Sequence, residues 1–570
     1  MADNEYPPPS PDTFREFGGA GGWPSPQPPP AGYPTQPPVG PGGGPGYWQP
    51  GTMPPPGQGS YPGAPGQTPG FVPNPPPPSK TSPFLIMALG GLALLVILVP
   101  LVLYALSRAP APTTRTPQAT ATPGGTTPAP TGTPSSSGSA FKPDGTAPTT
   151  RQCNTVVVIP CYSPQEMQQA FSLNALYAQG YDGKGQTIVI IAAGNTDHVE
   201  KDLQAFDKAW GLPDPPSFKI VQPFGPPTPY KCSDFNDLDG LQIETALDVE
   251  WSHAMAPGAS IVVVVGPNKE LKYFPVPKNA PSCGLYDLED PVAYALDKKL
   301  GNIISISYGG SELGTRTDTA VDKTNEQKEY DAAHEIFKRA ASMGVTVMAS
   351  SGDNGATNPN DYVNHNLFWD KPNVSWPASD PYVLAIGGTS LTIQDENGVY
   401  GSETTWNNNG GSTGGGLSAL YGEPAYQKNV PDQGMFQGKR GLPDLAFPAD
   451  VNYLLYETSD FGTIDVSKWP HWNLIGGTSA SSPCWAGLIA IADQMSAQAG
   501  GGPLGYIQPG LYSLKGQAFH DITKGNNNFQ RVAGYAAVTG YDLVTGWGTP
   551  IADQLLPALI QAVQTVGNTP

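Results

Sequence analysis

Short apolar runs bounded by turn residues recur along the second part of the chain. Each run is nearly continuous and rich in β-branched residues, which is typical of a strand buried on both faces. Longer stretches with a helical spacing of apolar residues lie between several of these runs. The expected strands are Thr187–Ala192, Ser260–Val265, Asn302–Ser307, Val345–Ala349 and Tyr382–Ile386, and the expected helices are Leu238–Met255 and Glu326–Met343.

The alternation of strands and helices predicts an α/β fold with a doubly wound, mostly parallel sheet that is flanked by helices. In such a sheet the functional groups gather at the carboxyl ends of the strands. We assign this globular domain to residues 151–570. That length is enough to bury one large core or two smaller ones.

The first part of the chain has a different texture. Residues 1–82 are dominated by Pro and Gly with almost no aliphatic residues, so they cannot bury enough apolar surface to fold and are predicted to be disordered. This tail can offer polyproline segments to a proline-reading partner, and a solvated tail with no fixed partner is the alternative. Residues 108–150 are rich in Thr, Pro and Ser and are predicted to be an extended linker.

Between these two segments lies an uncharged apolar run, Phe84–Leu106. As a helix it would span about 34 Å, enough to cross the hydrocarbon core of a bilayer, so residues 83–107 are predicted to be a transmembrane helix. Lys80 on one side and Arg108 and Arg115 on the other do not decide the orientation. The predicted localisation is a single-pass membrane protein, with the globular domain extracellular and the N-terminal tail cytoplasmic.

Charge and cysteine content narrow the possible environments. The formal net charge is −19, which argues against a nucleic-acid partner and suits an acidic medium. None of the five cysteines has CxxC spacing. Cys153 with Cys161, and Cys232 with Cys283, can form disulfides in an oxidising compartment, while Cys484 sits in an apolar run as a free thiol. Five reduced cysteines are the alternative.

The first chemical motif is the string Gly476–Pro483, GGTSASSP, which precedes an apolar helical stretch. It describes a serine nucleophile, Ser479, at a helix N-terminus, with glycines that let a substrate backbone approach. A lone serine there would more often be an N-cap. A nucleophilic serine needs a base, and none of the six histidines stands in the His-Gly-Thr context of a subtilisin-type site.

The second motif is Glu244 and Asp248 within the helix Leu238–Met255. Their i,i+4 spacing places both carboxyl groups on one helix face, where they repel each other when both are ionised. One pKa should therefore rise, and the pair can share a proton and serve as an acid/base device. A solvated acidic face is the alternative, but the rest of the helix is apolar.

The third motif is the turn Gly352-Asp353-Asn354-Gly355, directly after the expected strand Val345–Ala349. Taken alone it is an ordinary turn. In a serine hydrolase, this location suits a donor to the oxyanion that develops in the transition state. Asp353 can donate only when it is protonated, which requires acidic conditions or a raised pKa.

With these three motifs in order, the chain resembles the sedolisin family of serine-carboxyl peptidases, whose fold is subtilisin-like. The resemblance covers roughly Cys153 to Val566 and is supported by six further stretches. They are Gly183–Ile191, Ala256–Val264, Ser305–Gly309, Trp376–Thr389, Gly414–Ser418 and Arg440–Leu445.

The resemblance implies a role for each motif residue. Ser479 would be the nucleophile, and Glu244 the general base that takes its proton. Asp248 would orient Glu244 and hold the shared proton, and Asp353 would be the acid of the oxyanion hole. The implied activity is hydrolysis of peptide bonds in proteins or peptides at acidic pH, through an acyl-enzyme.

The resemblance also implies one structural Ca²⁺ near the C-terminus. Its ligands would be the carboxylates of Asp521 and Asp542 and the backbone carbonyls of Ile522, Val538 and Gly540. Oxygen-only ligation of this kind suits calcium. The family's usual glycine is replaced by Val538, which changes the turn but leaves a carbonyl in place.

Two departures from the family pattern stand out. Where relatives have a large folded pro-domain, this chain has the apolar run and the low-complexity linker. Where many relatives place an acid that extends the carboxylate network, it has Ala192-Ala193-Gly194. Two alternatives to an acid-acting peptidase therefore stay open: a binding domain on an inactive peptidase scaffold, and a neutral hydrolase with a histidine base.

Overall fold

The computed structural model of the chain describes residues 147–567, except residues 157–158, 226–237, 268–287, 315–319, 361–366, 409, 432 and 459–468. The predicted tail at 1–82, the predicted helix at 83–107 and nearly all of the predicted linker at 108–150 lie outside the described residues, as does the Cys232–Cys283 pair.

An eight-stranded sheet forms the centre of the domain, with the order β14-β8-β6-β4-β1-β3-β2, and β9 pairs with β8. All pairs along this order are parallel, and only β9 runs antiparallel to its neighbour. The predicted mostly parallel sheet is therefore confirmed. Its strands are β1 (Thr187–Ala192), β2 (Phe218–Val221), β3 (Ser260–Val265), β4 (Ile303–Ile306), β6 (Thr346–Ser350), β8 (Val383–Ile393), β9 (Tyr400–Thr405) and β14 (Leu445–Pro448).

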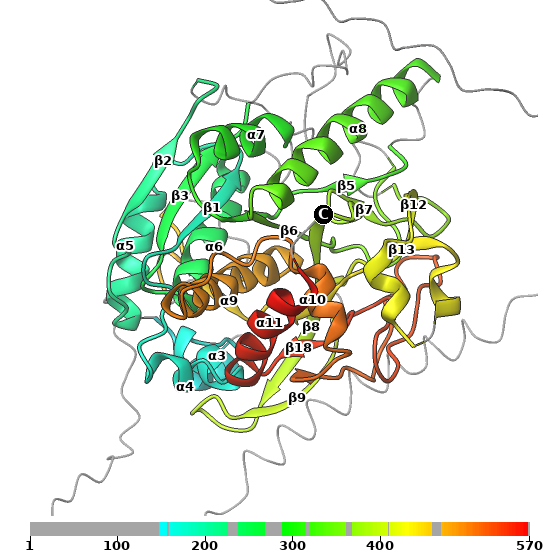
Figure 1. Cartoon of the computed structure of the whole chain (residues 1–570). Coiled ribbons are helices and arrows are strands. Elements are labelled where there is room, and N and C mark those ends of the chain that lie inside the picture. The colour runs from blue at the N-terminus through cyan, green and yellow to red at the C-terminus, as the bar shows by residue number, and fades with distance from the viewer. Residues whose placement is uncertain are drawn as a thin grey trace, which may run out of the picture. The chain divides into compact units, whose positions relative to one another are not determined.

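Helices cover both faces of this sheet (Figure 1). Helices α7 and α8 pack together on one face, and α6 and α9 pack together on the other. The helices are α2 (Thr150–Val156), α3 (Pro164–Ala170), α4 (Asn174–Tyr177), α5 (Val199–Trp210), α6 (Leu238–Met255), α7 (Glu289–Lys298), α8 (Ala320–Ser342), α9 (Thr478–Gln498), α10 (Gln508–Ser513) and α11 (Ala552–Val566), with 3-10 turns η1 (Ala425–Asn429) and η2 (Gln433–Phe436).

Short two-stranded sheets lie in the loops around the central sheet. They are β5 (Gly310–Ser311) with β7 (Ser375–Trp376), β10 (Asn407–Asn408) with β11 (Gly411–Ser412), β12 (Gly416–Gly422) with β13 (Lys439–Leu442), β15 (Tyr453–Tyr456) with β16 (Trp472–Ile475), and β17 (Phe519–His520) with β18 (Thr549–Pro550).

The continuous apolar runs form strands because both faces of each strand are buried. In β1, Ile188 and Ile190 belong to the core beneath α6 and α9, whereas Val189 and Ile191 belong to the core beneath α7 and α8. Strand β1 has parallel neighbours on both sides, β3 and β4, so its backbone groups are also paired. This arrangement requires apolar residues at successive positions, as the sequence shows.

Helices α6 and α9 approach each other closely in the core. A side chain at Gly487 of α9 would place its Cβ 2.5 Å from the Cβ of Met255 in α6, so only glycine allows this contact. Both helices are buried along most of their length, which fixes their relative position. The N-terminus of α9, which begins at Thr478, is thereby held beside the middle of α6.

The cysteine predictions are confirmed within the described residues. Cys153 and Cys161 form a disulfide with Cα atoms 5.8 Å apart, and Cys484 is a buried free thiol on α9. The disulfide ties α2 to the segment that leads into α3.

The predicted localisation needs correction. Searching the described part of the chain finds no helix that combines the length and the apolar character needed to cross a bilayer. The segment on which the single-pass prediction rests, residues 84–106, lies outside the described residues.

A cluster of buried acids lies where α5, α6 and the end of β15 meet. Asp202 and Asp207 of α5 and Glu250 of α6 are at most 1% exposed. The Asp202 carboxylate accepts a hydrogen bond from the Thr458 hydroxyl at 2.8 Å, and Glu250 accepts the Tyr456 N–H at 3.0 Å.

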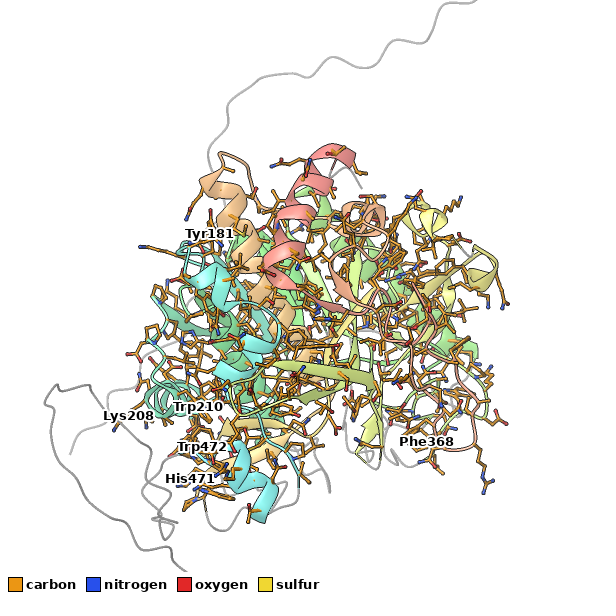
Figure 2. The ribbon with its side chains drawn as sticks, turned by 90° about the horizontal axis from the view of Figure 1, so that it is seen from below. Tyr181, Lys208, Trp210, Phe368, His471 and Trp472 are labelled. Atoms are coloured by element: carbon orange, nitrogen blue, oxygen red, sulfur yellow. A yellow bond between two sulfur atoms is a disulfide. The ribbon has the colours of Figure 1, made fainter. Side chains whose placement is uncertain are left out.

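The surroundings of this cluster are largely apolar and aromatic. Trp210 and Trp472 pack edge to face across it, with ring centroids 5.7 Å apart, and both lie at one edge of the domain in Figure 2. His253 is its basic neighbour, with Nε2 3.3 Å from Asp207 and 2.8 Å from the Pro213 carbonyl. Glu457, which accepts a hydrogen bond from Gln242, completes it.

Burial shifts the titration of these acids toward higher pH. It raises the pKa of Asp207 to about 8, and nearby Asp214 adds to the effect. Burial also raises the pKa of Asp202 and Glu250, and for Glu250 the neighbouring carboxyl groups add to it. In the opposite sense, burial lowers the pKa of His253 to about 4.

We predict that the domain is more stable at mildly acidic pH than at pH ~8. The folded acids keep protons that the unfolded chain releases above pH ~4, so stability falls as pH rises toward the folded pKa values. His253 opposes this only below its ordinary pKa of 6.5, so above that pH the acids act alone. The midpoint of thermal unfolding should drop by roughly 3 °C or more between pH ~6.5 and ~8.

Asp207→Asn is the matched variant, because it removes the titrating group and keeps the shape. Its unfolding midpoint should depend less on pH than that of the unchanged chain, with the gain in stability concentrated near pH ~8. Equal pH slopes in both proteins would contradict this account of the cluster.

Candidate active site

The structure brings the four predicted site residues together at the carboxyl edge of the sheet. Glu244 and Asp248 lie on α6, Asp353 follows β6, and Ser479 is in the first turn of α9. The Ser479 hydroxyl is close enough to Glu244 to favour its ionised form, and the Asp353 carboxyl acts on Glu244 through its charge. Three separate stretches of sequence thus meet at the start of α9.

The two carboxyl groups on α6 are buried next to each other. Asp248 is 0% exposed, and Glu244 is half-buried with its Oε1 shielded from solvent. Burial raises the pKa of both groups, and for Asp248 the charge of Glu244 adds to the shift. Because two anions this close repel in a low dielectric, the pair keeps one proton over a wide pH range.

Ser307 joins this pair to the serine from a fourth stretch of the chain. It directly follows β4, and its Oγ donates to Asp248 Oδ1 at 2.6 Å. The Ser479 Oγ in turn donates to the Ser307 carbonyl oxygen at 3.3 Å, a long hydrogen bond that leaves the hydroxyl able to turn toward Glu244. Ser307 lies in the stretch Ser305–Gly309 of the family resemblance, but no local motif indicates a role for it.

Asp353 is fixed against the start of α9 by one of its two oxygens. Its Oδ1 accepts the backbone N–H of Thr478 at 2.8 Å and the Thr478 hydroxyl at 2.9 Å. Burial raises the pKa of Asp353, and the two bonds from Thr478 oppose the rise. Since Oδ1 is occupied by two donors, Oδ2 is the oxygen that can carry a proton toward a ligand.

Gly477 makes room for this carboxyl. Its φ is +115°, and a side chain there would place its Cβ 2.7 Å from Asp353 Oδ2. Only glycine satisfies both the backbone conformation and the contact. Gly477 therefore leaves the space that the Asp353 carboxyl occupies beside the start of α9.

Histidines are engaged elsewhere in the described part of the domain. His253 contacts Pro213, and His334 contacts Asp380 with Nδ1 2.8 Å from Oδ2. His520 stacks on the Tyr400 ring with centroids 3.7 Å apart, and His471 packs on Tyr456. The titratable group that lies beside the Ser479 hydroxyl is the carboxyl group of Glu244.

The residues implied for calcium also come together. Asp521 Oδ2 accepts the Gly540 N–H at 3.0 Å, and Asp542 Oδ2 accepts the Val538 N–H at 3.0 Å. Both carboxyl groups thus contact one short loop. Burial raises the pKa of Asp542 to about 6, and backbone donors from that loop and from Val544 and Thr545 oppose the rise. Within the described residues no group of three or more His, Cys, Asp or Glu has a metal-binding arrangement, so carbonyl oxygens would have to complete the shell.

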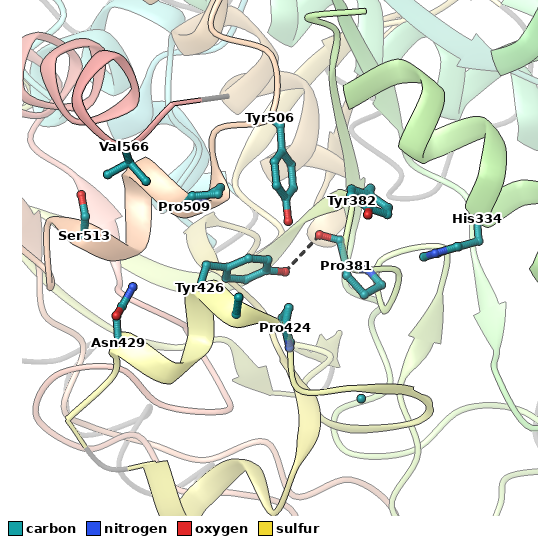
Figure 3. A pocket seen from close by; sticks show the side chains of 12 residues that line it. His334, Pro381, Tyr382, Pro424, Tyr426, Asn429, Tyr506, Pro509, Ser513 and Val566 are labelled. Carbon is teal, nitrogen blue, oxygen red and sulfur yellow. Dashed lines mark hydrogen bonds between the residues drawn. The ribbon is translucent and has the colours of Figure 1, made fainter. Parts of the chain in front are cut away.

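A tyrosine-lined pocket of about 490 Å³ lies elsewhere and includes none of the four site residues (Figure 3). Tyr382, Tyr426 and Tyr506 form its walls, and the Tyr426 hydroxyl donates to the Pro381 carbonyl at 3.1 Å. His334 lies at its edge, beside Tyr382.

A doubly wound sheet with a serine at the start of a buried central helix defines the subtilisin-like class of hydrolases. The model of the Subtilase family matches residues 242–502, which include Glu244, Asp248, Asp353 and Ser479. The chain is 27% identical to a solved structure of Pseudomonas sedolisin, described as a serine-carboxyl proteinase in complex with two molecules of pseudo-iodotyrostatin. The TM-score is 0.53, and the match covers 70% of this chain and 97% of that one.

Curated relatives narrow the class further. The chain is 35% identical to kumamolisin of Bacillus sp. (strain MN-32) over 413 residues, which is 70% of this chain and 64% of the relative. It is 30% identical to sedolisin of Pseudomonas sp. (strain 101), covering 64% of this chain and 56% of the relative, and 28% identical to tripeptidyl-peptidase 1 of Canis lupus familiaris, covering 56% and 52%. The chain belongs to the sedolisin family of serine-carboxyl peptidases, and it spans about half to two thirds of the length of these relatives.

Proposed function

We propose that the domain is an acid-acting serine-carboxyl endopeptidase that cleaves proteins or peptides through an acyl-enzyme on Ser479. The observation that carries this proposal is that Glu244 of α6 lies beside the Ser479 hydroxyl, while Asp353, after the end of β6, is hydrogen-bonded to the preceding residue, Thr478. Family membership supports the same chemistry.

In the first step, Glu244 in its ionised form takes the Ser479 proton as Oγ attacks the scissile carbonyl carbon. Asp248 holds the proton that the pair shares, so that Glu244 can be the ionised partner although both carboxyl groups are buried. Collapse of the tetrahedral intermediate expels the amine, which receives the proton from Glu244. Water then repeats the sequence on the acyl-enzyme.

Asp353 stabilises the negative oxygen of that intermediate. Its neutral carboxyl donates from Oδ2 while Thr478 holds Oδ1. The group acts only below its pKa, which burial raises. Glu244 acts only when the pair has lost its first proton. The two requirements together give a bell-shaped pH–rate profile, and family membership supports an optimum on the acid side of neutrality.

The inactive-scaffold alternative lacks support in the geometry, because a binding domain has no need for a buried proton-sharing pair, a serine and a neutral acid in one place. The histidine-base alternative lacks support among the described residues. Four of their histidines contact groups other than Ser479, and His198 acts through its charge on Asp202.

We predict that Ser479→Ala lowers hydrolysis of a denatured protein at pH ~4 by about 10³-fold or more. Glu244→Gln should lower it by about 10²–10⁴-fold, because an amide cannot accept the proton.

Peptides with blocked N-termini test internal cleavage, since an enzyme that only removes tripeptides needs a free N-terminus. Activity that rises toward pH ~7 and survives Glu244→Gln would establish a histidine base instead.

Asp353→Asn separates the oxyanion role from a structural one. The amide can still accept from Thr478 and still donate to the oxyanion, but it no longer depends on a bound proton. We predict a smaller loss of kcat than the roughly 10²–10³-fold loss expected for Asp353→Ala. The alkaline limb of the pH–rate profile should also move to higher pH. An alkaline limb that stays in place would assign it to another group.

We also propose a structural Ca²⁺ held by the Asp521 and Asp542 carboxylates and the carbonyls of Ile522, Val538 and Gly540. Support comes from the shared loop that both carboxyl groups contact and from the all-oxygen donor set. Bound there, the ion would neutralise two acids, one of which is only 2% exposed.

We predict that a chelator lowers the thermal unfolding midpoint of the protein by several degrees and that Ca²⁺ restores it, because the ion binds the folded state alone. Asp521→Asn should remove the response to both additions. An unfolding midpoint that is unchanged by the chelator and by added Ca²⁺ would contradict the site.

A further inference from the structure

The Ser307 hydroxyl lies between the carboxylate pair and the nucleophile. Its Oγ is 2.6 Å from Asp248 Oδ1 and 3.3 Å from the backbone carbonyl oxygen of Ser479. Both neighbours are acceptors when Asp248 is ionised, and the hydroxyl has one hydrogen to give. Its orientation is therefore tied to the protonation state of Asp248.

Two states of this arrangement are chemically complete. When Asp248 is ionised, Ser307 donates to it in a charge-assisted hydrogen bond. When Asp248 carries the proton, it can donate to the Ser307 Oγ, and the serine hydrogen then turns to the Ser479 carbonyl. Rotation of one hydroxyl thus accommodates both states without movement of a heavy atom.

The rotation of the Ser307 hydroxyl is important because few other groups can hydrogen-bond to Asp248. Asp248 is fully buried, and its other oxygen, Oδ2, has no hydrogen-bond partner among the described residues. The Ser307 hydroxyl is therefore the group that satisfies Asp248 there. The Ser307 carbonyl also accepts the Ser479 hydroxyl at 3.3 Å, so one residue touches both ends of the acid/base system.

We propose that Ser307 is a positioning residue of the active site. Its hydroxyl changes orientation when the proton shared by Glu244 and Asp248 moves, and it keeps both protonation states of Asp248 hydrogen-bonded. This inference rests on the proposed peptidase function. It adds a hydroxyl relay from a fourth segment, after β4, to the carboxyl groups of α6 and the serine of α9.

Three variants of the full chain test the relay, with pH–rate profiles of kcat and KM and thermal unfolding measured for each. Ser307→Ala removes the hydroxyl, and Ser307→Thr keeps one. Ser305→Ala is the matched control, since Ser305 lies two residues away in β4 and its buried hydroxyl is 2.9 Å from the Ser482 hydroxyl instead.

For Ser307→Ala we expect kcat to fall roughly tenfold or more with little change in KM, because a hydrogen bond to a charged group is lost. The pH–rate profile should shift to higher pH, because Asp248 loses the donor that favours its ionised form. Ser307→Thr should restore the profile, and Ser305→Ala should leave the profile in place while lowering the unfolding midpoint.

The outcomes separate this inference from the proposed function. If the unchanged chain hydrolyses peptides at acidic pH and Ser479→Ala abolishes that activity, the function stands. A Ser307→Ala profile that superimposes on that of the unchanged chain, or a Ser305→Ala profile that shifts equally, then overturns the relay alone. An unchanged chain without activity overturns both.

Discussion

The carboxyl groups of this domain lie in places where water cannot solvate their charge, and the chemistry of the site depends on that constraint. Asp248 is fully buried and next to Glu244, so ionising both would put two negative charges in a low dielectric. The pair therefore retains a proton, and burial also raises the pKa of Asp353. A carboxyl that keeps its proton can donate a hydrogen bond, and a pair with one proton can act as a base.

Packing of the core determines where these groups meet. Gly487 lets α9 lie against α6, and Gly477 leaves space for the Asp353 carboxyl at the start of α9. Both contacts depend on the absence of a side chain, so they fix distances that a larger residue would change. The site is thus assembled by close approach of two buried helices at the edge of a parallel sheet, where strand ends present polar residues.

Elements with a single pattern of apolar residues along their whole length were predictable from the sequence. Elements in which the pattern changes part of the way along were not. The bounds of β1, β3 and α6 agree with the prediction because their residues are apolar throughout or helical in period. Strand β8 continues to Ile393, beyond the predicted end at Ile386, since its second half pairs with β9 and alternates buried and more exposed residues. A search for unbroken runs of apolar residues does not detect such a strand.

The same distinction applies to polar sites. Ser479, Asp353 and the α6 pair each stand in a local motif, so a role could be proposed for each of them from the sequence around it. The role of Ser307 could not be inferred in this way. Its partner Asp248 is 59 residues away in the sequence, and the residues next to Ser307 are typical of an ordinary strand end. The acids around Asp207 were missed likewise, since nothing in α5 alone indicates that Glu250 of α6 will be buried against it.

A buried ion pair connects the central sheet to the C-terminal loop. Arg440 is fully buried and pairs with Asp444 at 2.6 Å, and the other Asp444 oxygen accepts the Tyr512 hydroxyl at 2.6 Å. Asp444 also accepts the Ala385 N–H at 2.8 Å, which ties β14 to β8. Tyr541, next to Asp542, donates to the carbonyl that precedes Asp444. Such a pair contributes little net stability but specifies one arrangement, because any other would leave a buried charge unpaired. The loop with the proposed calcium ligands is thereby connected through Asp444 to the sheet whose edge carries the proposed catalytic groups.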